Sequence, residues 1–210
     1  MNRGQNAADA GTNEEMRRFF NQCAPSWDGA CGASREKIAA VVTLAGVRPG
    51  VRVADIACGT GILFAEILER GPEEIFGIDL SDAMIARARV KFSDPRIRLA
   101  ASDVFAVRET GFDIVTIFSA YPHFSDKRRL AEQAAFMLKP GGRLLVAHCE
   151  SRTAVNGHHM GRQVRCLSTP LRPVREEAEE FSPLFSIDML ADTDEFYFFS
   201  GTKRQNKAGA

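Results

Sequence analysis

The four histidines of this chain fall into two short stretches whose residue types could support catalysis. His148, His158 and His159 lie in AHCESRTAVNGHHM (147–160), and His123 lies in YPHF. A neutral imidazole has a pKa near ~6.5, so it can accept a proton from an attacking nucleophile at neutral pH. His123, or His159 in support, is therefore a candidate general base.

The same histidines could instead bind a divalent metal ion, because imidazole, thiolate and carboxylate are common metal ligands. This alternative combines His123 and His159 with a third ligand, for which His148, Cys149 and Glu150 are candidates. A third alternative is that the histidines hydrogen-bond loops or shape a pocket, which suits His148 because we expect it inside a strand. No spacing in the sequence decides among the three.

Three aspartates lie at the ends of apolar segments, where a nucleoside could bind. They are Asp55 in VADIACGTG, Asp79 in FGIDLS and Asp103 in AASDVF. Asp79 could accept hydrogen bonds from both ribose hydroxyls, and Asp103 could accept one from the adenine amino group while Val104 packs on the ring. S-adenosylmethionine has an ammonium group, a cationic sulfonium and no phosphate, so acidic side chains suit it.

The glycine turn after Asp55 distinguishes this ligand from a dinucleotide. Gly59 and Gly61 permit a tight turn and a close approach of the backbone. A dinucleotide fingerprint that starts at Gly59 would need glycine at position 64, where this chain has Phe64. A pyrophosphate would also meet the negative charge of Asp55. The sequence therefore disfavours a nicotinamide-dependent oxidoreductase.

The segments between these residues alternate between strand-like and helix-like patterns. Short apolar, β-branched runs predict buried strands at 51–57, 74–80, 96–102, 112–118 and 142–148. Helix-forming patterns lie at 35–47, 61–70, 81–92, 126–139 and 173–181. This alternation predicts a doubly wound, Rossmann-like α/β fold with a seven-stranded, mainly parallel sheet. Residues 185–202 read as two strands joined by ADTDE, which predicts a C-terminal antiparallel hairpin.

In such a fold, ligands bind beyond the carboxyl ends of the strands. His123 follows the fourth predicted strand, and the 147–160 stretch begins at the end of the fifth. We therefore expect the histidines to face the same cleft as the glycine turn.

Several segments, taken in order, resemble the motifs of class I S-adenosylmethionine-dependent methyltransferases. They are VADIACGTG, GIDLSDAMIARAR, ASDVF, FDIVTIFSAYPHF and LKPGGRLLV. The resemblance implies three groups of residues that bind S-adenosylmethionine. The methionine part of the cofactor would contact Asp55, Gly59, Thr60 and Gly61. The ribose and adenine would contact Asp79, Leu80, Met84, Asp103 and Val104, and the residues beneath the cofactor would be Phe118 and Ser119.

One position departs from the family pattern D-x-G-x-G-x-G, because its first glycine is Ala57 here. A methyl group at this position would crowd the cofactor or demand a backbone angle that alanine dislikes.

Within this family the chain is similar to a bacterial subgroup of small methyltransferases. The subgroup carries three motifs, A-x-x-W-D, P-H-F and S-R-x-x-x-N-x-x-H. In this chain they lie at residues 24–28, 122–124 and 151–159. Trp27 is expected to cap the cofactor pocket or to anchor the N-terminal helix. Other candidate catalytic residues are Arg152, which could pair with an acidic substrate group or a cleft carboxylate, and Tyr121, as a second base or a pocket wall.

Length and charge narrow the class of protein. The chain has 210 residues with 27 basic and 27 acidic side chains, so no basic excess points to nucleic acid or an anionic membrane. We expect a disordered N-terminus (1–11), one domain (12–202) with an N-terminal cap segment (12–34), and a flexible tail (203–210). A capping box at TNEE would start the first helix at Thr12. The lack of a signal segment or membrane span, and the scattered cysteines, predict a cytoplasmic protein.

The sequence as a whole predicts S-adenosylmethionine-dependent methyl transfer to an O, N or S nucleophile on a small molecule, with a divalent metal as an open alternative. A second function is a methyltransferase-like protein that binds the cofactor or a metal without turnover, which Ala57 favours.

Overall fold

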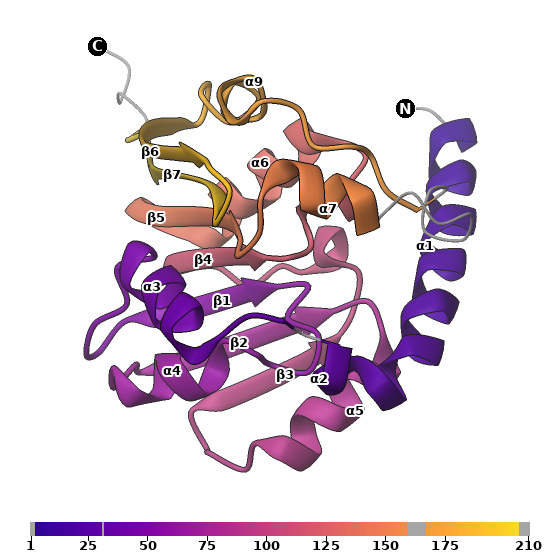
Figure 1. The fold of residues 1–210 in the computed structure, drawn as a ribbon, viewed down its shortest axis with the longest axis horizontal. Helices are drawn as coiled ribbons and strands as arrows, with labels where there is room; N and C mark the ends of the chain where they lie inside the picture. Colours follow the sequence, from indigo (N-terminus) through magenta and orange to yellow (C-terminus); the bar gives the residue numbers. More distant parts are fainter. Residues whose placement is uncertain (1–2, 31, 159–166, 206–210) are drawn as a thin grey trace.

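The computed structural model describes residues 3–30, 32–158 and 167–205. Its strands are β1 Arg52–Ile56, β2 Glu74–Asp79, β3 Ile97–Ala101, β4 Phe112–Phe118, β5 Leu138–His148, β6 Phe185–Asp192 and β7 Tyr197–Lys203. They form one seven-stranded sheet in the order β3-β2-β1-β4-β5-β7-β6 (Figure 1). β1 to β5 pair in parallel, and β7 runs antiparallel to both β5 and β6. The predicted fold class and terminal hairpin are therefore confirmed.

Helices cover both faces of this sheet. They are α1 Arg3–Cys23, α2 Trp27–Ala30, α3 Arg35–Leu44, α4 Phe64–Glu69, α5 Asp82–Lys91, α6 Lys127–Met137, α7 Arg152–His158 and α9 Val174–Glu179. Short 3₁₀ turns follow at Ala24–Ser26, Val104–Ala106 and Tyr121–His123. No helix among the described residues is long and apolar enough to cross a membrane.

Two apolar cores lie on the two faces, because successive strand residues point to opposite sides. Val53 of β1 belongs to a core with Val41 of α3 and Ile67 of α4. Ile56, three residues later in β1, belongs to the other core, with Leu130 of α6 and residues of α9. The sheet is thus the middle of three layers.

Side-chain caps fix where several helices begin. Ser34 accepts a hydrogen bond from the Lys37 amide at the start of α3, and Ser81 accepts one from Met84 at the start of α5. Asp126 accepts one from the Arg129 amide at the start of α6. Each cap contributes about 1 kcal/mol. Two of these starts, those of α5 and α6, lie where the chain leaves the carboxyl edge of the sheet.

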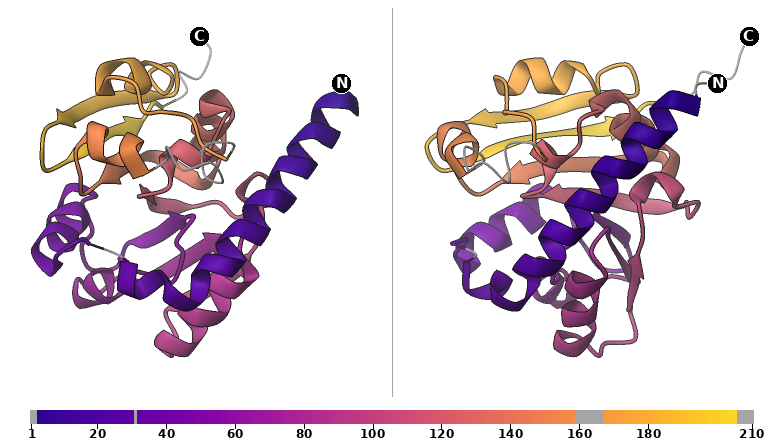
Figure 2. Two further views of the ribbon diagram at one scale, coloured as in Figure 1. Left: turned by 45° about the vertical axis from the view of Figure 1, so that its right-hand side comes forward. Right: turned by 90° about the vertical axis from the view of Figure 1, so that its right-hand side faces the viewer.

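The first helix is longer than the sequence predicts. α1 begins at Arg3, so Thr12 lies inside the helix and is not its N-cap, and helix replaces the predicted disorder over most of 1–11. Alanines at 7, 8 and 10 favour a helical backbone in this stretch. At the other end, β7 reaches Lys203, one residue beyond the predicted limit of the domain. Figure 2 shows α1 as a long rod along one side of the molecule.

Candidate functional site

The described residues form a large cleft of about 1360 Å³ at the carboxyl edge of the sheet. Its floor comes from the residues that follow β1, β2, β4 and β5, and Figure 1 shows α1 beside the edge to which the arrow of β1 points. Met16 and Phe20 of α1 contribute to the outer wall. This volume exceeds the range of about 300–1,000 Å³ that is typical of small-molecule pockets, so the cleft has room for a nucleoside and a second small molecule.

The turn after β1 has an unusual backbone. Ala57, Gly59 and Gly61 all have positive φ, of 56°, 56° and 83°. A side chain at Gly61 would place its Cβ 2.5 Å from the Phe64 ring, so only glycine fits there. The expectation that Ala57 takes an angle that alanine dislikes is therefore confirmed, and Ala57 also lines the cleft.

Asp79, at the end of β2, holds this turn in place. Its carboxylate accepts hydrogen bonds from the Gly59 amide and from the Ser81 amide, both at 2.8 Å. Burial raises its pKa, although the two amide bonds oppose this shift. Asp79 still lines the cleft together with Leu80, as the ribose assignment requires.

Asp103 lies at the far end of the same cleft. Its Oδ1 caps the 3₁₀ turn by accepting from the Phe105 amide at 3.0 Å. Its Oδ2 accepts a hydrogen bond from Nδ2 of Asn13 on α1 at 2.9 Å. Val104, Phe118 and Ser119 line the cleft as well. Asn13, which the sequence gave no reason to single out, thus contacts the carboxylate expected to bind adenine.

Four residues predicted to hold the cofactor are absent from the cleft lining that the described residues form: Asp55, Thr60, Gly61 and Met84. Asp55 is 1% exposed and accepts a hydrogen bond from Thr116 Oγ1 at 2.6 Å. Burial raises its pKa to about 7. Thr60 donates its hydroxyl to Asp28 at 2.5 Å, and Met84 is a buried residue of α5. None of these four residues lines the cleft that the described residues form.

The N-terminal cap segment fastens onto the turn. Trp27 lines the cleft, and its Nε1 is 3.4 Å from the position that a Cβ on Gly59 would take. Its ring packs edge-on against Phe20 at 5.7 Å. Asp28 accepts from Thr60 and forms an ion pair with Lys91 at 2.9 Å. Trp27 therefore both covers the turn and joins it to α1.

Among the described histidines, His123 is the best placed for proton transfer. It lines the cleft, and its Nδ1 lies 3.1 Å from the Leu167 carbonyl oxygen. A carbonyl only accepts, so Nδ1 carries the proton and Nε2 is the basic nitrogen of the neutral ring. The Phe20 ring packs edge-on against the imidazole at 5.0 Å.

The other histidines differ in their surroundings. His148 lines the cleft but is 3% exposed, and its ring packs 6.2 Å from that of Tyr197. His158 lies 3.1 Å from Glu150 in an exposed pair. His159 lies outside the described residues, and within them no group of three His, Cys, Asp or Glu side chains could hold a metal ion.

Two predicted catalytic residues lie away from the cleft in the part of the chain that the structure describes. Tyr121 is 0% exposed and donates its hydroxyl to Glu177 at 2.8 Å. Burial raises the pKa of this hydroxyl. Arg152 pairs with Asp192 at 3.0 Å, which lies in β6 and not in the cleft. Neither side chain is part of the cleft lining that the described residues form, and each is bound to another residue, so their catalytic roles stay predictions.

Asn156, the asparagine of the S-R-x-x-x-N-x-x-H motif, also has a structural partner. Its Nδ2 donates to the Leu171 carbonyl at 3.1 Å, and its Oδ1 accepts from the Leu171 amide at 2.7 Å. The Thr169 amide donates to the Pro122 carbonyl at 2.8 Å. The segment 167–172 is thereby held beside His123 and forms one side of the cleft.

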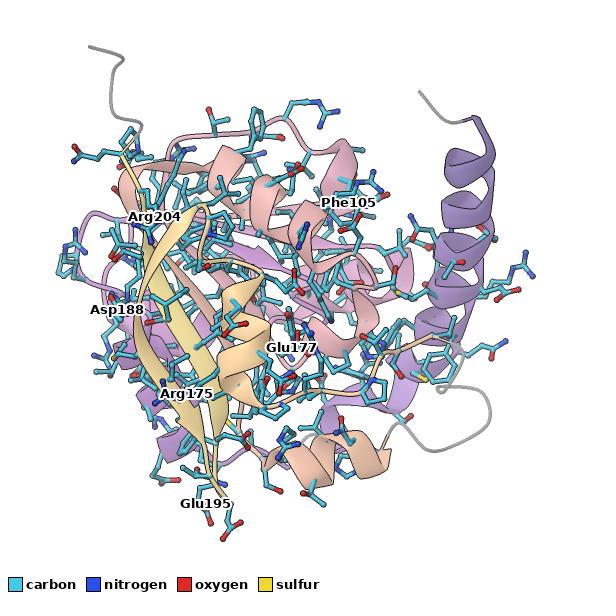
Figure 3. All side chains as sticks on the ribbon, turned by 90° about the horizontal axis from the view of Figure 1, so that it is seen from above. Phe105, Arg175, Glu177, Asp188, Glu195 and Arg204 are labelled. Atoms are coloured by element: carbon cyan, nitrogen blue, oxygen red, sulfur yellow. The ribbon has the colours of Figure 1, made fainter. Side chains whose placement is uncertain are left out.

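Sequence reasoning missed the charged wall opposite α1. Lys127, Arg172 and Glu177 all line the cleft, next to Arg128 and Glu180. Figure 3 labels Glu177 on α9, and Phe105 nearer to α1. Lys127 follows P-H-F by only three residues, and that spacing from the predicted strand end was the available signal.

The sequence is similar to known methyltransferases over part of its length. Residues 53–142 match a family model described as a methyltransferase domain. The ubiquinone biosynthesis O-methyltransferase of Xylella fastidiosa (strain 9a5c) is 33% identical over 103 residues, which make up 47% of this chain and 42% of that protein. The match thus spans less than half the length of this relative.

Solved structures match over most of the chain. One chain of the complex between the Haloferax volcanii Trm112 methyltransferase activator and a methyltransferase has a TM-score of 0.74 at 19% identity, with 89% of this chain and 98% of that chain covered. Magnesium protoporphyrin IX methyltransferase (ChlM) from Synechocystis PCC 6803 with bound SAH has a TM-score of 0.68 at 15% identity, with 90% and 98% covered. At these identities the likeness establishes a shared fold.

Proposed function

Since this chain has the fold of the class I methyltransferases and matches a methyltransferase domain over residues 53–142, we propose that it transfers the methyl group of S-adenosylmethionine to a small molecule. The observation that carries the proposal is the turn Ala57–Gly61, which Asp79 holds open toward the cleft that Asp103 also lines. Two carboxylates at the ends of the neighbouring strands β2 and β3 suit the ribose and the adenine amino group of one nucleoside.

The relatives support a small-molecule acceptor. The Xylella fastidiosa protein is named for ubiquinone biosynthesis, and the Synechocystis protein is named for magnesium protoporphyrin IX. The cleft continues past the turn to His123 and the 167–172 segment, which gives room for an acceptor. We propose an O, N or S nucleophile that approaches the methyl group from this side.

The reaction would be an in-line displacement at the methyl carbon. A lone pair on the nucleophile forms the new bond, the carbon–sulfur bond breaks, and S-adenosylhomocysteine leaves with the electron pair. The proton of the nucleophile passes to Nε2 of His123, whose Nδ1 is held by Leu167. Orientation of the two reactants and exclusion of water would supply most of the rate enhancement.

A metal-assisted form of this reaction would use His123, His159 and His148. Its test is elemental analysis of untagged protein beside a double variant, His123→Ala with His159→Ala. Near-stoichiometric metal that disappears in the double variant supports this form, and metal-free wild type after incubation with divalent ions contradicts it.

The alternative function, binding without turnover, is favoured by one observation: the Ala57 methyl group lies in the cleft where the family has glycine. Formation of S-adenosylhomocysteine from S-adenosylmethionine, measured with a panel of phenols, carboxylic acids, amines and thiols, decides between the two. Turnover with any acceptor, lowered at least about 100-fold in His123→Gln while cofactor affinity is kept, supports the enzyme and its base. Cofactor binding without turnover across the panel favours the alternative.

A further inference from the structure

Lys127 is a half-buried cation on the acceptor side of the cleft. It is the first residue of α6, and its Nζ donates to the Tyr121 carbonyl at 2.7 Å. The same Nζ lies 3.7 Å from the centre of the Tyr121 ring. The side chain nevertheless lines the cleft, four residues after His123.

The carboxylates beside Lys127 are already paired with arginines. Glu177 accepts from the Arg172 amide at 3.1 Å and from its guanidinium at 3.2 and 3.3 Å, as well as from the Tyr121 hydroxyl. Glu180 pairs with Arg128 at 3.0 Å and with Arg172 at 3.2 Å. Among the described residues Lys127 forms no ion pair of its own, so its charge is balanced only at a distance, chiefly by Glu177.

A half-buried ammonium in this position is poorly compensated. Burial lowers the Lys127 pKa to about 8, although the nearby charge of Glu177 opposes the shift. The side chain is therefore still mainly protonated at neutral pH, at a cost that an anion in the cleft would offset.

Aromatic side chains also line the cleft, beside the charged residues. Phe20 packs against both Trp27 and His123, and Phe105 packs edge-on against Phe124 at 6.3 Å. All five side chains line the cleft. Aromatic walls of this kind suit a flat or apolar molecule whose orientation is set by one or two polar contacts.

We propose that Lys127 binds an anionic oxygen of the methyl acceptor, so that the acceptor is an aromatic or apolar small molecule with a carboxylate or phenolate group. The inference rests on the proposed function, since it names the substrate class of that site. The ammonium orients the acceptor and favours its deprotonated form, while proton removal remains the task of His123.

The test compares 4-fluorobenzoate with 4-fluorobenzamide, a neutral probe of nearly the same size and shape. Their dissociation constants are measured by ¹⁹F NMR line broadening, with and without saturating S-adenosylhomocysteine. Wild-type protein is expected to prefer the benzoate by about tenfold or more, the range of a charge-assisted hydrogen bond. Lys127→Met should lose this preference and Lys127→Arg should retain it. The matched control is Lys139→Met, at an exposed lysine paired with Asp113.

Equal binding of both probes to wild-type protein would overturn the proposal, whether or not a variant folds. A preference that survives in Lys127→Met would overturn it too. Titration with S-adenosylhomocysteine separates this failure from a failure of the proposed function. If the cofactor product binds while the probes are not distinguished, only the anion subsite is wrong. If it does not bind, the proposed function is wrong, and the comparison in cofactor-free protein still decides the role of Lys127.

Discussion

Replacing Ala57 by glycine tests whether the cofactor turn stores backbone strain. Ala57 has φ of 56°, in the left-handed region. For an L-residue with a Cβ this conformation costs about 1–2 kcal/mol, which Ala57→Gly should release. Against this, glycine adds about 0.4–1 kcal/mol of unfolded-state entropy. Loss of a half-buried methyl group costs about 0.4 kcal/mol more. The net change should lie between about 0.4 kcal/mol of destabilisation and about 1 kcal/mol of stabilisation.

The matched control is Ala54→Gly, three residues earlier in β1. Ala54 is 0% exposed and does not have positive φ, so glycine there relieves no strain. Its methyl loss and the added unfolded-state entropy should destabilise the protein by about 1–2 kcal/mol. The two variants should therefore differ by about 1–2 kcal/mol, with Ala57→Gly the more stable. Urea unfolding of both, followed by circular dichroism, measures the difference.

Equal destabilisation by both substitutions would refute the strain argument. It would mean that Ala57 sits in its turn without penalty, and that the missing family glycine has no consequence for folding. A clear gain in stability for Ala57→Gly would instead show that this chain keeps a strained residue at the edge of its cofactor cleft.

Three further outcomes follow from buried contacts of the site. In the folded protein the pKa of Asp55 is raised to about 7, so this carboxyl stabilises the folded state below pH ~4, and the stabilisation is lost as pH rises through 7. Relative to wild type, the free energy of unfolding of Asp55→Asn in urea should therefore increase by on the order of 3 kcal/mol between pH 4 and 7. A difference between variant and wild type that does not change with pH would contradict this. Asp28→Ala removes a partly exposed link to the glycine turn and should cost about 0.5–1.5 kcal/mol, with weaker S-adenosylhomocysteine binding by calorimetry; unchanged affinity would show that the link is dispensable. Asn156→Ala leaves the Leu171 backbone unpaired, so hydrogen exchange at residues 167–172 should become faster while β1 stays protected. Exchange as slow as in wild type would show that the Asn156–Leu171 hydrogen bonds do not hold this segment.

The sheet, the turn and the strand-end aspartates could be predicted because each depends on local pattern. Apolar runs of strand length and the spacing of Gly59 and Gly61 are visible in the sequence alone. Since parallel strands all end at one edge, Asp79 and Asp103 had to meet there. The same topology brought His123 to that edge, as the cleft lining confirms.

The roles of Tyr121 and Arg152 could not be predicted, because distant residues decide them. Tyr121 is bonded to Glu177, 56 positions away, and Arg152 is paired with Asp192, 40 positions away. Lys127 was missed for a related reason: a lysine at a helix start reads as a surface residue until its burial against the Tyr121 ring is known.

The most direct test of the central claim is a crystal structure with S-adenosylhomocysteine bound. The account predicts the nucleoside in the cleft, with the ribose hydroxyls on the Asp79 carboxylate and the adenine amino group on Asp103. Asn13 should then have released its hydrogen bond to Asp103. S-adenosylhomocysteine bound elsewhere, or bound in this cleft without contact to either carboxylate, would contradict the account.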